Sequence, residues 1–143
     1  MPSDPSSRLI TADGRRPRVA VVAGQHAASM VATMLVEQFG CTWVAAPSGE
    51  AALALLRQEA GIDLVIIDLG IADMDGAVAA QLIRALGPHG SMPIIALTSA
   101  HADDAAPRGR AAGFSASLAK PYSPRELYGA LQNALAKSSV AAG

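Results

Sequence analysis

Three side chains spread along the sequence could together handle a phosphoryl group. Asp68 offers a carboxylate, Thr98 a hydroxyl and Lys120 an ammonium group. A carboxylate can attack phosphorus, a hydroxyl can hold a phosphoryl oxygen, and a lysine offsets negative charge. The combination suits phosphoryl chemistry if the fold brings these distant residues together.

Each of the three residues follows a short run that is typical of a buried strand. Most of the five runs are continuously apolar, as in a parallel sheet covered on both faces. The expected strands are Arg18 to Val22, Thr42 to Ala46, Asp63 to Ile67, Pro93 to Leu97 and Ser115 to Leu118. Because parallel strands end at one edge of a sheet, the three functional side chains should meet there. Ala23 and Gly24, after the first strand, should lie at the same place.

Helical patterns separate the expected strands. They cover about His26 to Phe39, Ser48 to Gly61 with Ser48 as the N-cap, Ala77 to Leu86, and Ser123 to Lys137. The last helix begins with Ser123-Pro124-Arg125-Glu126, a capping box with proline at the first helical position. A further helix is expected after His101, where Pro107 either delays its start or kinks it.

This alternation predicts an α/β fold, a flavodoxin-like three-layer sandwich. Its parallel five-stranded sheet should have the order 2-1-3-4-5, with five helices on the two faces. Residues 18–137 should form this domain. Residues 1–17, rich in Pro, Ser, Asp, Gly and Arg, are expected to be a flexible N-terminal segment or linker, and residues 138–143 a flexible tail.

Composition narrows the class of protein. The chain has 143 residues and a net charge of -1, which gives no electrostatic reason to expect a nucleic-acid partner. The single cysteine, Cys41, excludes an internal disulfide and fits a reducing compartment. No apolar run reaches the length of a membrane span. These features predict a cytoplasmic domain without a membrane partner.

From Arg18 to Lys137 the chain resembles the receiver domain of bacterial two-component response regulators and hybrid histidine kinases. The resemblance rests on Asp68 in IIDLGIADMDG, Thr98 in PIIALTSA and Lys120-Pro121 in LAKPYSPREL. It implies that the aspartate takes a phosphoryl group from a phosphohistidine with the assistance of Mg²⁺. It also implies that the Lys-Pro bond is cis, which proline permits at modest cost.

Other positions depart from the family pattern. The acidic pair that holds Mg²⁺ in the family falls on Ala23 and Gly24. The aromatic residue that reports phosphorylation falls on Ser117, and the Met-Pro that follows the acceptor falls on Ile71-Ala72. We therefore expect a degenerate receiver, or pseudo-receiver, that keeps the acceptor but has lost the metal site and the switch.

The loss of the acidic pair has a calculable consequence. Two unit charges about 4 Å apart interact by roughly 4 kcal/mol at an effective dielectric constant near 20. Losing that much transition-state stabilisation slows a reaction about a thousandfold. We expect no catalytic residues and no cofactor beyond weakly held Mg²⁺, and therefore an interaction module rather than an enzyme.

The expected partners are a histidine kinase or other domains of a hybrid kinase. The contact surface should be the face of the fourth helix, the fifth strand and the fifth helix. Arg108, Arg110 and Tyr122 on that face could bind cyclic di-GMP, as in some degenerate receivers of hybrid kinases, or could be ordinary surface residues. Two alternatives stay open, namely a working acceptor phosphorylated on Asp68 and a dedicated cyclic-dinucleotide sensor that regulates a kinase.

Overall fold

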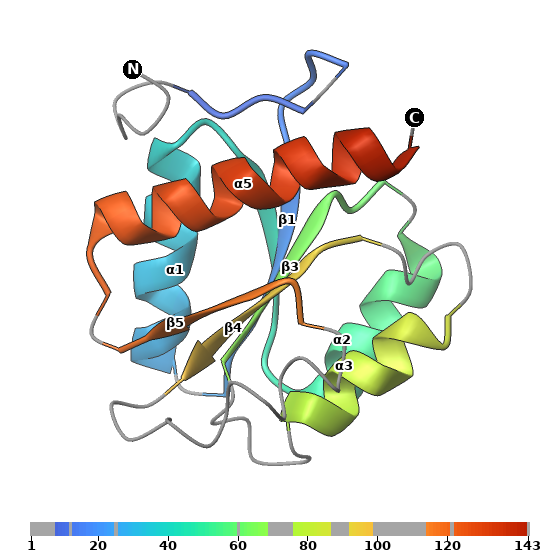
Figure 1. Ribbon diagram of the computed structural model, residues 1–143. Helices are drawn as coiled ribbons and strands as arrows, with labels where there is room; N and C mark the ends of the chain where they lie inside the picture. Colours follow the sequence, from blue (N-terminus) through green and yellow to red (C-terminus); the bar gives the residue numbers. More distant parts are fainter. Residues whose placement is uncertain are drawn as a thin grey trace.

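The computed structural model describes residues 8–11, 13–24, 26–59, 61–68, 76–86, 92–98, 114–120 and 122–142. The elements found there alternate between strands and helices (Figure 1). In chain order they are β1 (Arg18–Val22), α1 (His26–Gln38), β2 (Thr42–Ala46), α2 (Gly49–Gln58), β3 (Leu64–Asp68), α3 (Gly76–Arg84), β4 (Ile94–Thr98), β5 (Ala116–Ala119) and α5 (Pro124–Ala142).

The five strands form one parallel sheet with the order β2-β1-β3-β4-β5, as predicted. Helices α1 and α5 cover one face, and α2 and α3 cover the other (Figure 1). The three-layer flavodoxin-like sandwich is therefore confirmed. The helix expected around Pro107 lies outside the described residues.

The sheet divides the core into two layers because successive strand residues point to opposite faces. Val21 and Ile66 pack toward α1 and α5, while Val22 and Ile67 pack toward α2 and α3. Every residue of β3 and β4 is buried. Full burial on both faces explains why these strands are continuous apolar runs rather than alternating ones.

Helix starts follow the predicted capping chemistry. Ser48 caps α2, its hydroxyl accepting a bond from the Ala51 N–H at 3.0 Å. Ser123 and Glu126 form a reciprocal capping box, with bonds of 3.0 Å and 2.9 Å. Both starts satisfy amide groups that have no partner inside the helix.

Several element ends differ from the sequence expectation. Strands β3, β4 and β5 each lie one residue later than predicted. Helix α2 ends at Gln58 rather than Gly61, since its C-cap residue Glu59 is extended. Helix α5 continues past Lys137 to Ala142, so residues 138–142 belong to a helix rather than to the expected tail.

The largest correction concerns residues 8–11 and 13–17, which we call the N-terminal strap. The Leu9 side chain is buried in the core layer of α1 and α5, and its N–H donates to the Phe39 carbonyl at 2.7 Å. Arg16 Nε donates to the Gly40 carbonyl at 2.9 Å. The Pro17 carbonyl accepts from the Thr42 N–H at 2.9 Å. This part of the predicted flexible segment is therefore packed against the domain.

Gly40 allows the strap to approach this closely. Its φ of +89° lies in the left-handed region that favours glycine. A Cβ at this position would also come within 2.9 Å of Arg8 Cβ. Arg15 adds an ion pair to Asp63 at 3.1 Å, but the Arg15 side chain is 55% exposed, and ion pairs in contact with water contribute little to stability. The apolar burial of Leu9 and the main-chain hydrogen bonds of the strap therefore hold it in place.

We expect Leu9→Ala to lower the free energy of unfolding by about 2–4 kcal/mol, because it removes a buried side chain and leaves a cavity. Leu82→Ala on α3 is the matched control, since that leucine is 41% exposed and should cost less than about 1 kcal/mol. Urea unfolding of both variants measures the difference. Equal losses would show that the strap does not contribute to the fold.

Candidate functional site

The three residues singled out for phosphoryl chemistry come together at the carboxyl edge of the sheet. Asp68 is the last residue of β3 and Thr98 the last of β4. Lys120 directly follows β5, and its N–H donates to the Thr98 carbonyl at 2.8 Å. The parallel register of β3, β4 and β5 thus brings a carboxylate, a hydroxyl and an ammonium group to one place.

Asp68 and Lys120 form a direct ion pair, in which Nζ donates to Oδ2. The Asp68 side chain is only 6% exposed, whereas that of Lys120 is 36% exposed. Removing a carboxylate from water costs several kcal/mol unless a cation and hydrogen bonds compensate. Lys120 supplies that compensation, with its stem crossing from the end of β5.

The Thr98 hydroxyl is turned toward the neighbouring strand. Its Oγ1 donates to the Leu118 carbonyl of β5 at 3.3 Å, and the residue is buried. The hydroxyl proton is therefore engaged by the sheet in this conformation. Its oxygen keeps accepting capacity, while donation to a phosphoryl oxygen would require this bond to break.

Ala23 and Gly24 occupy the end of β1, where they bring no side-chain oxygen to the site. Ala23 is buried, and its N–H extends the ladder to the Ala46 carbonyl at 3.1 Å. Mg²⁺ favours near-octahedral oxygen coordination and is commonly held by one or two carboxylates. No group of three His, Cys, Asp or Glu side chains that could hold a metal occurs among the described residues. Among the described residues, the carboxylate at this edge is that of Asp68, which is already paired with the Lys120 ammonium group, so these donors fit Mg²⁺ poorly.

Tyr122 lies nearer to the acceptor residue than the sequence suggested. It is half-buried and packs against the core layer of α1 and α5. Burial raises the pKa of the Tyr122 phenol, and the negative charge of Asp68 raises it further. The ring was predicted on the outer face as a stacking group. Its position two residues after Lys120 was the available sign that it could border the site.

Of the other residues predicted to matter, the structure describes Ser117 but not the two arginines or Pro121. Ser117, at the position of the family's aromatic residue, is an exposed residue of β5. Arg108 and Arg110 lie outside the described residues, as does Pro121 of the Lys-Pro bond. The cyclic di-GMP site therefore stays a prediction. Of the expected contact face, the structure describes β5 and α5 only.

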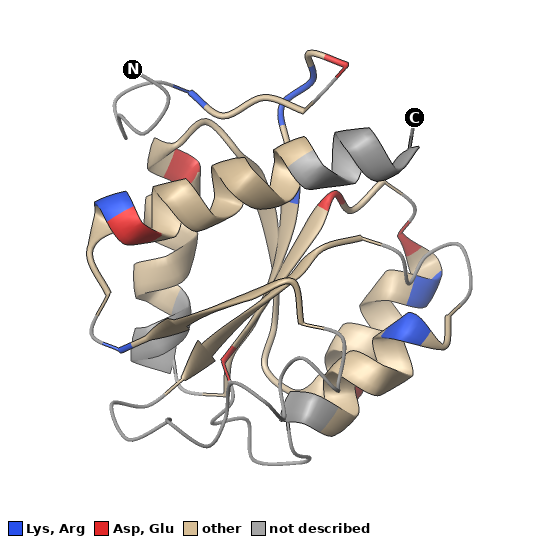
Figure 2. Ribbon diagram, viewed as in Figure 1, with Lys and Arg blue, Asp and Glu red and all other residues tan. Residues whose placement is uncertain are grey.

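Charged residues are sparse in the described part of the chain. Figure 2 shows acidic and basic residues in small groups of both signs, mostly near the ends of elements. The presence of both signs agrees with the net charge of -1. None of the helices within the described ranges combines the length and apolar character that a membrane span requires.

Comparison with known proteins identifies the family. The response regulator receiver domain family matches residues 19–132. The chain is 38% identical over 117 residues to the sensor protein GacS of Pseudomonas syringae pv. syringae, covering 79% of this chain and 13% of that protein. It is 32% identical over 146 residues to the virulence sensor protein BvgS of Bordetella pertussis, covering 97% of this chain and 11% of that protein. The chain thus spans only a small part of these relatives.

A solved structure agrees with this result. The signal receiver domain of an HD domain-containing protein from Pseudomonas fluorescens Pf-5 superposes with a TM-score of 0.79 at 28% identity. The match covers 88% of this chain and 99% of that one. The sheet order, the converging residues and these similarities lead to one conclusion: the chain belongs to the response regulator receiver domain family, whose members are signalling modules of two-component systems.

Proposed function

We propose that this chain is a degenerate receiver domain that signals through protein contacts rather than through phosphorylation of Asp68. The observation that carries the proposal is the direct Asp68–Lys120 ion pair beside Ala23 and Gly24. The carboxylate is neutralised by a side chain of the same domain. The positions that would supply two further carboxylates hold none.

Electrostatics explains why phosphorylation should be slow. A phosphoryl donor brings negative charge toward Asp68, and a divalent ion would normally offset part of that repulsion. Without it, about 4 kcal/mol of stabilisation is lost at an effective dielectric near 20, equivalent to about a thousandfold in rate. Lys120 offsets some of this negative charge. Its ammonium group, however, already donates to Asp68 Oδ2, and a carboxylate oxygen of Asp68 is the atom that would have to attack phosphorus.

The proposed context is an assembly with a histidine kinase or with other domains of a hybrid kinase. GacS and BvgS are sensor proteins, and the region similar to this chain makes up 13% of GacS and 11% of BvgS. We propose the face that includes β5 and α5 as the contact surface for such domains. The exposed Ser117 leaves this face without the aromatic residue that would couple it to the acceptor, so the face need not respond to phosphorylation.

The competing function is a working phospho-acceptor, favoured by the convergence of Asp68, Thr98 and Lys120. Incubation with acetyl phosphate and Mg²⁺, followed by intact-mass measurement, separates the two. We expect little or no phosphoryl adduct on the parent chain. The double variant Ala23→Asp with Gly24→Asp restores two carboxylates and should gain modification, which Asp68→Asn added to it should abolish. Stoichiometric modification of the parent that Asp68→Asn removes would contradict the proposal.

The same double variant tests whether the site binds Mg²⁺. Millimolar Mg²⁺ should leave the thermal midpoint of the parent unchanged, because a ligand stabilises only the state that it binds. In the double variant, added carboxylates near Asp68 should lower stability without metal through mutual repulsion, and Mg²⁺ should restore it. Thermal scans with Mg²⁺ and with a chelator measure both effects. A rise of several degrees in the parent would mean that the native site holds the ion.

Cyclic di-GMP is a second candidate ligand, motivated by Arg108, Arg110 and the partly exposed ring of Tyr122. If it binds, loss of a charge-assisted contact in Arg108→Ala should weaken affinity by about ten- to a hundredfold. Isothermal titration calorimetry measures this, with Arg57→Ala as the control, because Arg57 is exposed on α2 at the other face of the sheet. Absence of binding heat with the parent chain would reject the candidate.

A further inference from the structure

Tyr122 lies between the Asp68–Lys120 ion pair and the core layer of α1 and α5. It comes two residues after Lys120, whose Nζ donates to Asp68 Oδ2. The Tyr122 side chain is half-buried and packs against that core layer. Burial raises the pKa of its phenol, and the Asp68 charge raises it further, so the carboxylate is within electrostatic reach. The side chain thus connects the neighbourhood of the pair to the core.

The ion pair by itself holds Lys120 only loosely. The Asp68 side chain is 6% exposed, but that of Lys120 is 36% exposed. A lysine side chain carries about 2 kcal/mol of rotamer entropy, which is lost when the side chain is fixed in one geometry. An ion pair whose cation is in contact with water offsets only part of that cost. How firmly the ammonium group stays on Asp68 therefore depends on the structure around Lys120.

Hydrogen bonds fix the main chain on both sides of Tyr122. Before it, the Lys120 N–H donates to the Thr98 carbonyl at 2.8 Å. After it, the Ser123 N–H donates to Glu126 Oε1 at 2.9 Å in the capping box of α5. The packing of Tyr122 in the core layer adds an anchor between these two points. The anchors restrict the main chain from which the Lys120 side chain reaches Asp68.

We propose that Tyr122 is a positioning residue for the ion pair, which acts through Lys120. Its ring anchors the chain beyond Lys120 and keeps water away from one side of the pair, so that Nζ stays on Asp68. Two charges attract more strongly where less water surrounds them. Ser117, at the position of the family's aromatic residue, is exposed and offers no ring here. The assignment concerns the pair itself and holds whether or not Asp68 accepts a phosphoryl group.

Trace acetylation of the full chain tests the assignment. The chain has only two lysines, Lys120 and Lys137, so mass spectrometry of its peptides follows Lys120 directly. An amine reacts with acetic anhydride in its uncharged form, whereas a carboxylate partner favours the charged form. Acetylation of Lys120, relative to free Nα-acetyllysine added to the same tube, therefore reports how firmly the ammonium group is held on Asp68.

We expect Tyr122→Ala to raise the relative acetylation of Lys120 severalfold. Tyr122→Phe keeps the ring and should stay near the parent value. Asp68→Asn should raise acetylation in the parent chain but add little to Tyr122→Ala, because both changes act through the same ion pair. Circular dichroism checks that each variant is folded. Tyr122→Leu, which keeps an apolar side chain but removes the ring, replaces Tyr122→Ala if that variant is unfolded, and the same increase is expected.

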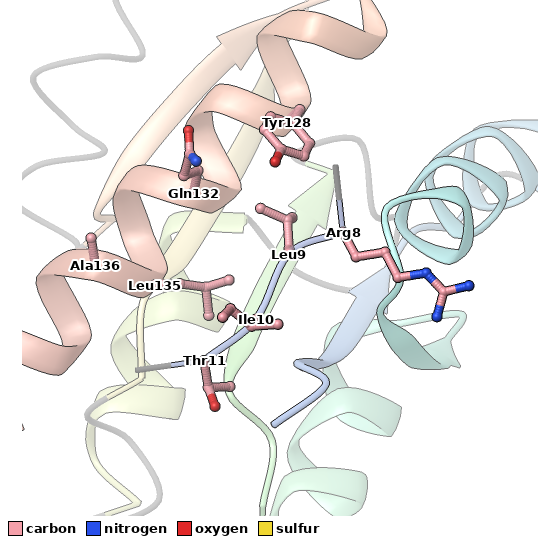
Figure 3. A pocket seen from close by; sticks show the side chains of 8 residues that line it. All are labelled: Arg8, Leu9, Ile10, Thr11, Tyr128, Gln132, Leu135 and Ala136. Atoms are coloured by element: carbon pink, nitrogen blue, oxygen red, sulfur yellow. The ribbon is translucent and has the colours of Figure 1, made fainter. Parts of the chain in front are cut away.

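Leu9→Ala is the control for a general loosening of the same core layer. Leu9 lies beside Tyr128 and Leu135 of α5 (Figure 3). The strap that carries Leu9 bonds Thr42 and Asp63 at the amino ends of β2 and β3, whereas Asp68 ends β3 at the opposite edge. Leu9→Ala should therefore lower stability without changing the acetylation of Lys120.

Three results would overturn the proposal. The first is a folded Tyr122→Ala or Tyr122→Leu variant in which Lys120 reacts as in the parent. The second is an equal increase in Tyr122→Phe or in Leu9→Ala, because the effect would then not belong to this ring. The third is an Asp68→Asn variant in which Lys120 reacts as in the parent, because the ion pair would then not protect the amine.

Discussion

The ion pair of Asp68 with Lys120 is the interaction on which this site depends. A carboxylate with 6% exposure at the end of a buried strand needs a cation nearby. The sheet order supplies one, because β4 and β5 follow β3 and the Lys120 N–H is tied to the Thr98 carbonyl. Folding the sheet therefore forms the pair, and the pair in turn makes the buried carboxylate tolerable.

The uncharged side chain of Ala23 is compatible with the Asp68–Lys120 ion pair. It is buried close to the edge where Asp68 lies, and a carboxylate there would add negative charge to an edge that has Lys120 as its nearby cation. Like charges at short range in a low-dielectric site cost several kcal/mol unless a further cation joins them. With alanine and glycine after β1, the described part of this edge pairs the Asp68 carboxylate with the Lys120 ammonium group and adds no further carboxylate beside them.

The fold could be predicted from sequence because its signals are local and strong. Continuous apolar runs marked the strands, and Ser48 and Ser123 marked two helix starts that the structure confirms. The one-residue shift of β4 and β5 could not be foreseen, since Ser115 bonds the Ile94 main chain from a position just before the strand. At the site, convergence of Asp68 and Lys120 was predictable from parallel strand ends. The position of Tyr122 depends on packing that no local pattern encodes.

The strap was missed for a different reason, because its composition is that of a linker and only Leu9 and Ile10 are strongly apolar. Its role emerges from contacts between distant elements. Phe39 at the end of α1 meets Tyr128 of α5 edge-to-face with ring centroids 5.2 Å apart. Leu9 packs in the same core layer and bonds the Phe39 carbonyl. That layer also holds Tyr122 at the opposite edge of the sheet. The strap therefore completes one packed layer, which reaches from Leu9 at the amino ends of the strands to Tyr122 at the acceptor edge.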